Sequence, residues 1–172
     1  MTDPWPRGAA GTDWGPLTDP PTTHAIRGDP MQHTTLGSTD ITIPRLCIGG
    51  MSFGDRCAGT HQWTIDQPAT QKVLARALEL GVDFIDTANA HAHGTSEEFI
   101  GQSLKNLGVK REDVVLASKV YFNEGTLTKQ AIEREIEGSL QRLDTDYLDP
   151  YIIIASTTTP RWRRRWRPST GS

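Results

Sequence analysis

Two histidines that stand two residues apart, His91 and His93, are the residues of this sequence best spaced to bind a metal ion. They follow a short apolar segment, and two imidazoles at this spacing can turn toward one divalent ion, as at the start of some barrel hydrolase sites. Such an enzyme needs further ligands from later strands, and the sequence has no histidine, cysteine or acid after residue 154. We therefore interpret the pair as loop histidines with weak adventitious affinity for zinc or nickel, and we predict no resident metal.

The two cysteines, Cys47 and Cys57, do not have the paired spacing of metal ligands. Two thiols in 172 residues also do not form a secreted disulfide framework, so we expect inert side chains in a reducing, cytoplasmic compartment. No segment approaches the ~20 apolar residues of a membrane span, and the first 30 residues lack the apolar core of a signal peptide. We expect a soluble, untargeted chain.

The last residues differ in charge from the rest of the chain. Residues 161–172 hold five arginines and no acid, so residues 1–160 carry 13 bases against 21 acids, or −8, within a total of −3. One hypothesis is a cationic tail that binds anionic membrane surface or nucleic acid through arginine and tryptophan. We favour a different interpretation, in which the tail is a short peptide of biased composition, translated in a shifted reading frame and without a designed purpose. The reason is that four of the five tryptophans lie in the flanks 1–30 and 157–172. We predict no specific nucleic-acid partner.

The elements that must position any site begin after residue 30. Residues 1–30 contain six prolines and four glycines, so we expect disorder there and a natural start at Met31. A hairpin is predicted next, with Gly37, Ser38 and Asp40 in its turn. Short apolar strands then alternate with amphipathic helices, which is typical of a parallel sheet with crossover helices. The expected strands are 46–48, 82–86, 114–119 and 147–154, and the expected helices are 66–80, 95–107 and 128–143.

The helix boundaries follow from capping residues. Asp66 is expected to cap the first helix and Gly81 to end it, while Thr95 and Glu98 have the spacing of a capping box for the second. Thr128 is expected to cap the third. In that helix, one buried stripe is predicted from apolar residues at spacings of four, four and three, namely Ile132, Ile136, Leu140 and Leu143.

Three motifs carry a family resemblance. They are Leu46-Cys-Ile-Gly-Gly-Met-Ser-Phe-Gly54, Gly81-Val-Asp-Phe-Ile-Asp-Thr-Ala88 with Thr95-Ser-Glu-Glu98, and Ser139-Leu-Gln-Arg-Leu-Asp-Thr-Asp-Tyr-Leu-Asp149. In their order and spacing, residues 31 to about 154 resemble the amino-terminal half of an aldo-keto reductase. The resemblance implies an α/β fold, a partial TIM (β/α)8 barrel over residues 31–156 with the first four strands and three helices after the hairpin.

The resemblance also implies a site. Family members pass a hydride between NADPH and a small-molecule aldehyde or ketone, using an aspartate, a tyrosine, a lysine and a histidine at the carboxyl ends of barrel strands. By position, the aspartate and lysine carry over to Asp86 and Lys119, whereas the tyrosine falls on His91 and the final histidine on Ile154. The lysine helps the phenol to lose its proton. We expect Lys119 to keep His91 uncharged, and Ile154 can neither donate to nor orient a carbonyl.

The cofactor contacts implied by the resemblance are similarly incomplete. Gly50, Met51 and Asp86 correspond to residues near the nicotinamide, but the family holds most of NADP(H) through loops after the seventh and eighth strands. Pro150 further suggests that the fourth strand is damaged or remains at an edge of the sheet. We therefore expect a truncated, inactive oxidoreductase of this family that binds NADP(H) poorly. The alternatives are a fragment that self-associates through open sheet edges, or the cationic tail described above.

Overall fold

The computed structural model describes residues 31–57, 62–120, 124 and 127–154. Residues 1–30, for which the sequence predicts disorder, and the basic segment 157–172 lie outside the described residues. The described elements are, in chain order, β1 (His33–Thr35), β2 (Thr42–Pro44), β3 (Ile48–Gly49), η1 (Gly50–Ser52), α1 (Gln67–Glu79), β4 (Phe84–Asp86), η2 (His91–Gly94), α2 (Thr95–Asn106), η3 (Arg111–Asp113), β5 (Val115–Val120), α3 (Lys129–Leu143) and β6 (Tyr151–Ile153).

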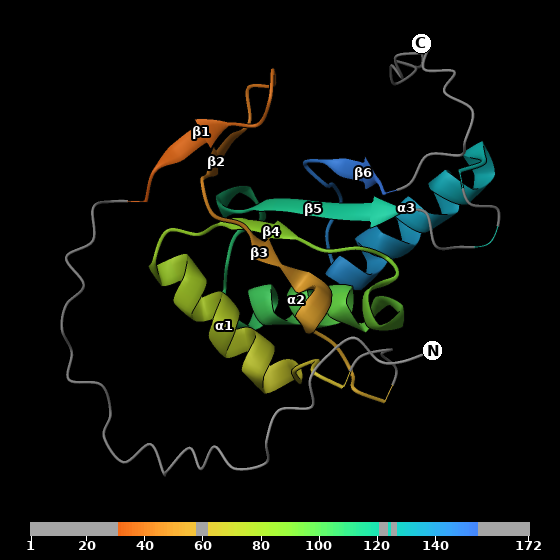
Figure 1. Ribbon diagram of the computed structural model, residues 1–172, viewed down its shortest axis with the longest axis horizontal. Helices are drawn as coiled ribbons and strands as arrows, with labels where there is room; N and C mark the ends of the chain where they lie inside the picture. The colour runs from red at the N-terminus through yellow and green to blue at the C-terminus, as the bar shows by residue number, and fades with distance from the viewer. Residues whose placement is uncertain (1–30, 58–61, 121–123, 125–126, 155–172) are drawn as a thin grey trace, which may run out of the picture.

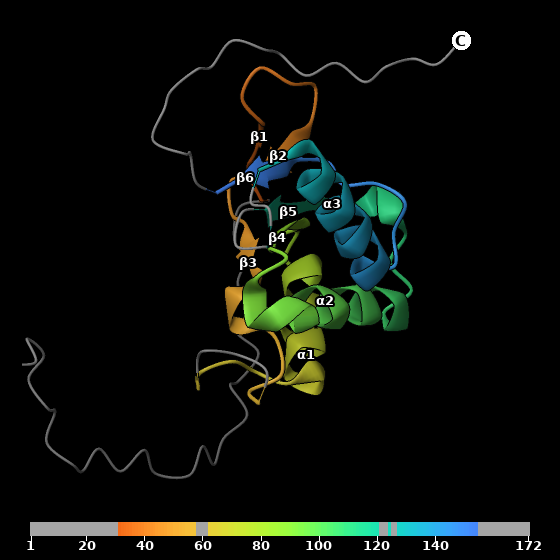
Figure 2. The ribbon, with the colours of Figure 1, turned by 90° about the vertical axis from the view of Figure 1, so that its right-hand side faces the viewer.

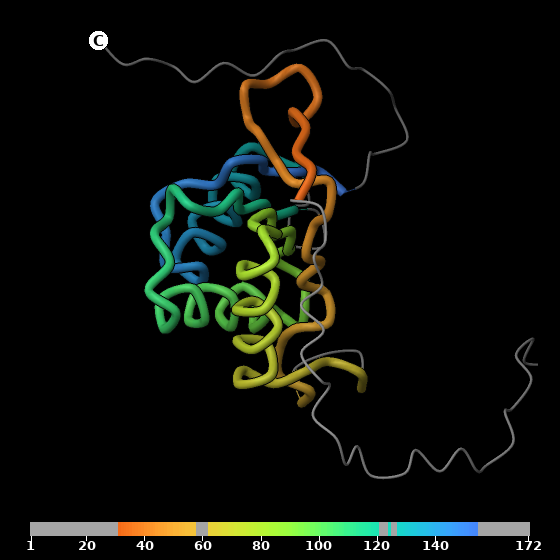
Figure 3. Tube along the Cα trace, turned by 90° about the vertical axis from the view of Figure 1, so that its left-hand side faces the viewer, coloured from red at the N-terminus to blue at the C-terminus, as the bar shows by residue number. Residues whose placement is uncertain are grey.

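The described strands form two sheets. β1 and β2 pair as an antiparallel hairpin, and the other strands form a parallel sheet in the order β3-β4-β5-β6 (Figure 1). One helix connects each strand of the parallel sheet to the next, and α1, α2 and α3 lie on the same side of it (Figure 2). The predicted hairpin, four strands and three helices are thus confirmed. The hairpin lies beyond one end of the parallel sheet (Figure 3).

The core lies between the parallel sheet and the helices. Its buried members share contacts across this layer and are Phe53, Leu74, Ile85, Ile100, Leu104, Val114, Leu116 and Leu143. Because side chains alternate along a strand, Ile85 and Leu116 on the helix side place Asp86 and Lys119 on the opposite side. We call this opposite side the open face. No helix of the described residues is long and apolar enough to cross a membrane.

The first helix begins and ends as predicted. The Asp66 side chain accepts a hydrogen bond from Ala69 N at 3.0 Å, and Gly81 has a left-handed φ of +78° after the last turn. The backbone N–H of Val82 donates to Ala77 O at 2.9 Å, so it completes the helix end and does not enter the sheet. This explains why β4 begins at Phe84 and not at Val82 as predicted.

The predicted capping box of the second helix is wrong. α2 begins at Thr95, and the residue before it is Gly94, which has a φ of +91° and no side chain to cap the helix. The Thr95 hydroxyl donates to Ala92 O and accepts from Asp55 N, while Glu98 is exposed. Thr95 therefore fixes the loop before α2 to the loop after β3.

The third helix has the predicted cap but a different buried stripe. The Thr128 hydroxyl accepts a hydrogen bond from Ala131 N at 3.3 Å. The fully buried residues of α3 are Ala131, Ser139 and Leu143, whereas the other residues of the predicted stripe, Ile132, Ile136 and Leu140, are half-buried. The buried side of α3 is rotated toward small residues because α2 packs closely against it, with Gly101 of α2 next to the backbone of Leu143.

The fourth parallel strand is shorter than the predicted 147–154. Asp149 precedes it and uses its carboxylate to accept hydrogen bonds from Leu116 N and Arg111, so the chain enters the sheet only at Tyr151. Pro150 lies just outside β6, where its carbonyl accepts from Ser118 N. Within the described residues β6 is an edge strand, which agrees with the expectation from Pro150.

Candidate active site at the carboxyl ends of β4 and β5

The predicted aspartate and lysine form an ion pair. Asp86 ends β4 and Lys119 lies near the end of the adjacent strand β5, and Lys119 Nζ is 2.5 Å from Asp86 Oδ2. The same Nζ donates to the backbone oxygen of Thr87 at 3.0 Å. Both side chains are partly buried, with exposed fractions of 20% for Lys119 and 28% for Asp86. Two of the three N–H groups of the Lys119 ammonium therefore have hydrogen-bond partners, which hold the cation at the end of the sheet.

The second carboxylate oxygen of Asp86 remains available. Asp86 Oδ1 is buried and has no hydrogen-bond partner among the described residues. The pKa of the nearby Cys47 thiol is raised to about 11, chiefly by partial burial and then by the negative charge of Asp86. The positive charge of Lys119 opposes this shift. The end of the sheet thus has an ammonium ion, a free carboxylate oxygen and a thiol that stays protonated at neutral pH.

His91 lies in the loop that follows β4. Its backbone N–H donates to Ala88 O at 3.1 Å, and its Nδ1 is buried without a partner among the described residues. Burial lowers the pKa of His91 below its ordinary value, and the positive charge of Lys119 lowers it further, against the opposing effects of Asp86 and Glu97. The imidazole is therefore neutral at pH 7, and burial is a larger cause than the repulsion by Lys119 that the sequence suggested.

His93 does not complete a metal site with His91. It is exposed and has a left-handed φ of +53°, next to Ala92 at +46°. In the described part of the chain, no group of three or more histidine, cysteine or acidic residues is placed to hold a metal ion. The loop that carries these histidines is anchored to β5 instead, because Asn89 N donates to Lys119 O at 3.1 Å.

A buried network behind the site was missed from the sequence. Glu97 of α2 is fully buried; it accepts hydrogen bonds from Ser118 Oγ at 2.5 Å and from Arg142 Nε at 2.7 Å. Ser118 immediately precedes Lys119, so the network connects α2 and α3 to the strand that carries the lysine. Its signal in the sequence was an acid on the same helix face as Ile100 and Leu104, where an unpaired charge would be unfavourable.

The two residues predicted to lie near a nicotinamide differ in exposure. Gly50 is buried beneath the end of β3, and a Cβ atom there would approach Ile100, Ser96 and Thr87 to 3.1 Å. Its carbonyl accepts from Ser96 Oγ at 2.7 Å. Gly50 therefore serves the packing of η1 on α2, whereas Met51 is 47% exposed at the carboxyl end of β3.

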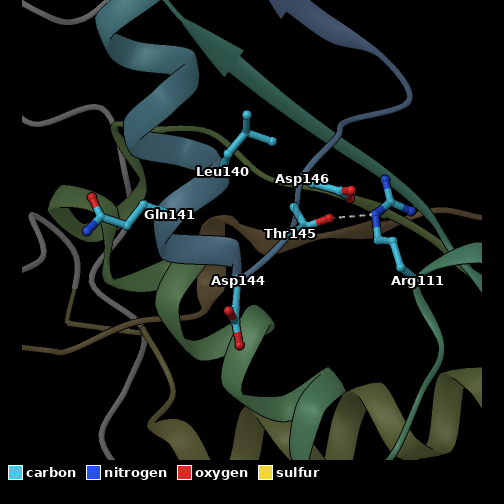
Figure 4. Close-up of a pocket in the computed structure, with 6 residues that line it drawn as sticks. All are labelled: Arg111, Leu140, Gln141, Asp144, Thr145 and Asp146. Atoms are coloured by element: carbon cyan, nitrogen blue, oxygen red, sulfur yellow. Dashed lines mark hydrogen bonds between the residues drawn. The ribbon is translucent and has the colours of Figure 1, made fainter.

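The described residues fit only one end of a dinucleotide. Asp86 Oδ1 and Met51 offer an acceptor and an exposed apolar surface beside the end of the sheet. Two hollows of the described residues lie elsewhere, around Arg111 and around Arg142. One of about 500 Å³ is lined by Arg111, Leu140, Gln141, Asp144, Thr145 and Asp146. There Arg111 donates to Thr145 Oγ1 at 3.0 Å, at the amino end of β5 and away from Lys119 (Figure 4). Asp86, Gly50 and Met51, which the resemblance places near the nicotinamide, do not line that hollow.

The comparison with protein families decides the relationship. A model of the aldo/keto reductase family matches residues 45–157. The chain belongs to the aldo/keto reductase family. Among curated relatives, the oxidoreductase YrpG of Bacillus subtilis is 34% identical over 150 residues, which cover 79% of this chain and 44% of YrpG. The aldo-keto reductase YhdN of the same organism is 35% identical, over 72% of this chain and 38% of YhdN.

Solved structures show the same relationship in three dimensions. A putative aldo-keto reductase of Pseudomonas aeruginosa matches with a TM-score of 0.61 at 31% identity, over 75% of this chain and 49% of that one. An aldo/keto reductase of Klebsiella pneumoniae, solved with NADP and acetate, matches with a TM-score of 0.51 at 36% identity, over 65% and 35%. The described strands and helices are thus part of the aldo/keto reductase barrel. The chain spans less than half the length of these relatives.

Proposed function

We propose that this aldo/keto reductase family member retains the charge-tuning half of a carbonyl reductase site and does not itself reduce aldehydes or ketones with NADPH. The observation that supports the proposal is the Lys119–Asp86 ion pair at the carboxyl ends of adjacent strands. Barrel enzymes place their catalytic groups at this end. The small-molecule carbonyl substrate class implied by the family and the cytoplasmic location expected from the two cysteines belong to the same proposal.

The chemistry explains why the pair alone is insufficient. A carbonyl oxygen that gains negative charge during reduction needs a proton from a nearby acid. A cation such as Lys119 makes a neighbouring phenol easier to ionise, but it makes an imidazole harder to protonate. With His91 neutral at pH 7 and the aliphatic Ile154 after β6, the described residues supply neither a ready proton nor a substrate anchor.

The direct test uses the purified full chain. We expect no saturable binding when it is titrated with NADPH and followed by nicotinamide fluorescence, and no turnover of an aromatic aldehyde. The Klebsiella relative, solved with NADP, provides a positive control for the binding assay. Saturable binding at micromolar NADPH together with aldehyde-dependent oxidation would refute the proposed inactivity.

A second experiment tests the ion pair without requiring activity. In the variant His91→Tyr, Lys119 should stabilise the phenolate of the new side chain, whereas burial of this position disfavours it, so the effect of Lys119 is measured as a difference from a variant without the lysine. The absorbance of tyrosinate during a pH titration measures this. The chain has three native tyrosines, so the titration curve of the wild type is subtracted and the remaining absorbance change belongs to the new phenol.

The matched control for this titration is the double variant His91→Tyr/Lys119→Met. The phenol should ionise about 1 to 3 pH units higher in the double variant than in His91→Tyr alone, because burial and Asp86 then act without the lysine. If the new phenol titrates identically with and without Lys119, the ion pair does not tune the position that His91 occupies, and the proposed role of Lys119 fails.

A further inference from the structure

The parallel sheet leaves two edges unpaired within the described residues. In the order β3-β4-β5-β6, β3 and β6 each have one neighbour in the sheet. Unpaired strand edges readily accept another strand, and natural proteins protect them or use them for association. What covers these edges therefore determines the assembly of this chain.

The β6 edge is apolar and has free backbone donors. Ile152, Ile153 and Ile154 are 37%, 44% and 41% exposed. Pro150 O and Ile154 N both bond to β5, at Ser118 N and Val120 O. Because backbone groups alternate in direction along a strand, the N–H groups of Tyr151 and Ile153 point away from β5 toward the free edge. This edge can therefore receive a strand without breaking its existing ladder.

The β3 edge presents a matching apolar surface. Leu46, just before the strand, is 60% exposed. A hollow of about 550 Å³ lies beside β3, between the strand and α1, and its lining includes Leu46, Ile48, Val73 and Leu80. Val73 and Leu80 are also exposed, at 43% and 49%. Both edges of the sheet are thus apolar, as expected of surfaces that another layer covers.

We propose that two copies of this chain pair β6 of each with β3 of the other and close one eight-stranded barrel. All strands of the described sheet run in the same direction. A two-fold axis parallel to the strands keeps the strands of both copies parallel and creates two identical β6–β3 seams. Four strands from each copy give the eight that a closed barrel of this family's architecture requires.

A second copy provides four strands with the correct direction and apolar edges. It also brings two Lys119–Asp86 pairs to the same interior, because these side chains lie on the open face of each sheet.

The assembly is tested by measuring mass in solution. Light scattering after size-exclusion chromatography should give twice the 19.0 kDa of the chain over a range of concentrations. Ile153→Pro removes an N–H that points to the free edge, so it should yield a folded monomer with an unchanged circular dichroism spectrum. Ile153→Ala is the matched control, because it shortens the same side chain but keeps the N–H, and most of it should remain dimeric.

The two cysteines provide an independent readout. Both are exposed. Cys47 precedes β3 and is near enough to Asp86 and Lys119 for both charges to affect its thiol, so it would be inside the closed barrel, whereas Cys57 lies in the loop after η1. Maleimide labelling at one pH should modify Cys57 equally in the wild type and in Ile153→Pro, but Cys47 at least ten times more slowly in the wild type. A monomeric wild type, a polydisperse polymer, a dimer unaffected by Ile153→Pro, or equal labelling of Cys47 in the two proteins would each overturn the proposal.

Discussion

Replacing Glu97 by alanine should destabilise the fold more than any single surface change. Glu97 is fully buried and bonds to Ser118, also fully buried, and to Arg142, which is 25% exposed. The variant leaves the Ser118 hydroxyl unsatisfied, which costs about 1 to 3 kcal/mol. It also removes the partner of a guanidinium that water can reach only in part. Breaking a buried pair in this way costs about 3 to 5 kcal/mol in total, and the partial exposure of Arg142 favours about 3.

The assay is urea unfolding followed by circular dichroism, at one protein concentration because association would add to the apparent stability. Glu97→Gln should lower the free energy of unfolding by roughly half as much as Glu97→Ala, because the glutamine amide can keep one of the two hydrogen bonds. Glu79→Ala is the control: the Arg76–Glu79 pair on α1 has side chains 62% and 64% exposed, and its loss should cost less than about 0.5 kcal/mol. If the free energies of unfolding of Glu97→Ala and Glu79→Ala differ by less than about 1 kcal/mol, the buried network does not hold the helices to β5.

Two further outcomes follow from close contacts and charge. Gly101→Ala should lower the free energy of unfolding by about 1 to 3 kcal/mol, because the new Cβ would lie 2.6 Å from the backbone oxygen of Leu143. The control is Gly138→Ala in α3. Its Cβ meets only a flexible arginine side chain, so this change should be neutral or stabilising. Because the pKa of Cys47 is raised to about 11, its alkylation rate should rise about tenfold for each pH unit from 8 to 10. Asp86→Asn should accelerate that reaction at pH 8, since it removes a negative charge that disfavours the thiolate; an unchanged rate would contradict this reasoning.

The local elements and half of the candidate site were predictable because their causes are local. Asp66 and Thr128 cap helices through their own side chains, and the strand–helix alternation follows from short apolar segments. Asp86 and Lys119 each end a predicted parallel strand, so they must lie at one edge of the sheet. Thr95 was misinterpreted because its hydroxyl contacts Asp55, forty residues away, a partner that no local pattern reveals.

The sequence by itself determined the family and the order of strands and helices, and it predicted that His91 and Ile154 stand where the family has a tyrosine and a histidine. Only the tertiary structure decided which groups are buried together. It lowered the pKa of His91 chiefly through burial, joined Glu97 to Ser118 and Arg142, and left the edges of β3 and β6 unpaired. Burial and pairing depend on atoms brought together from distant parts of the chain, so residue type and spacing do not specify them.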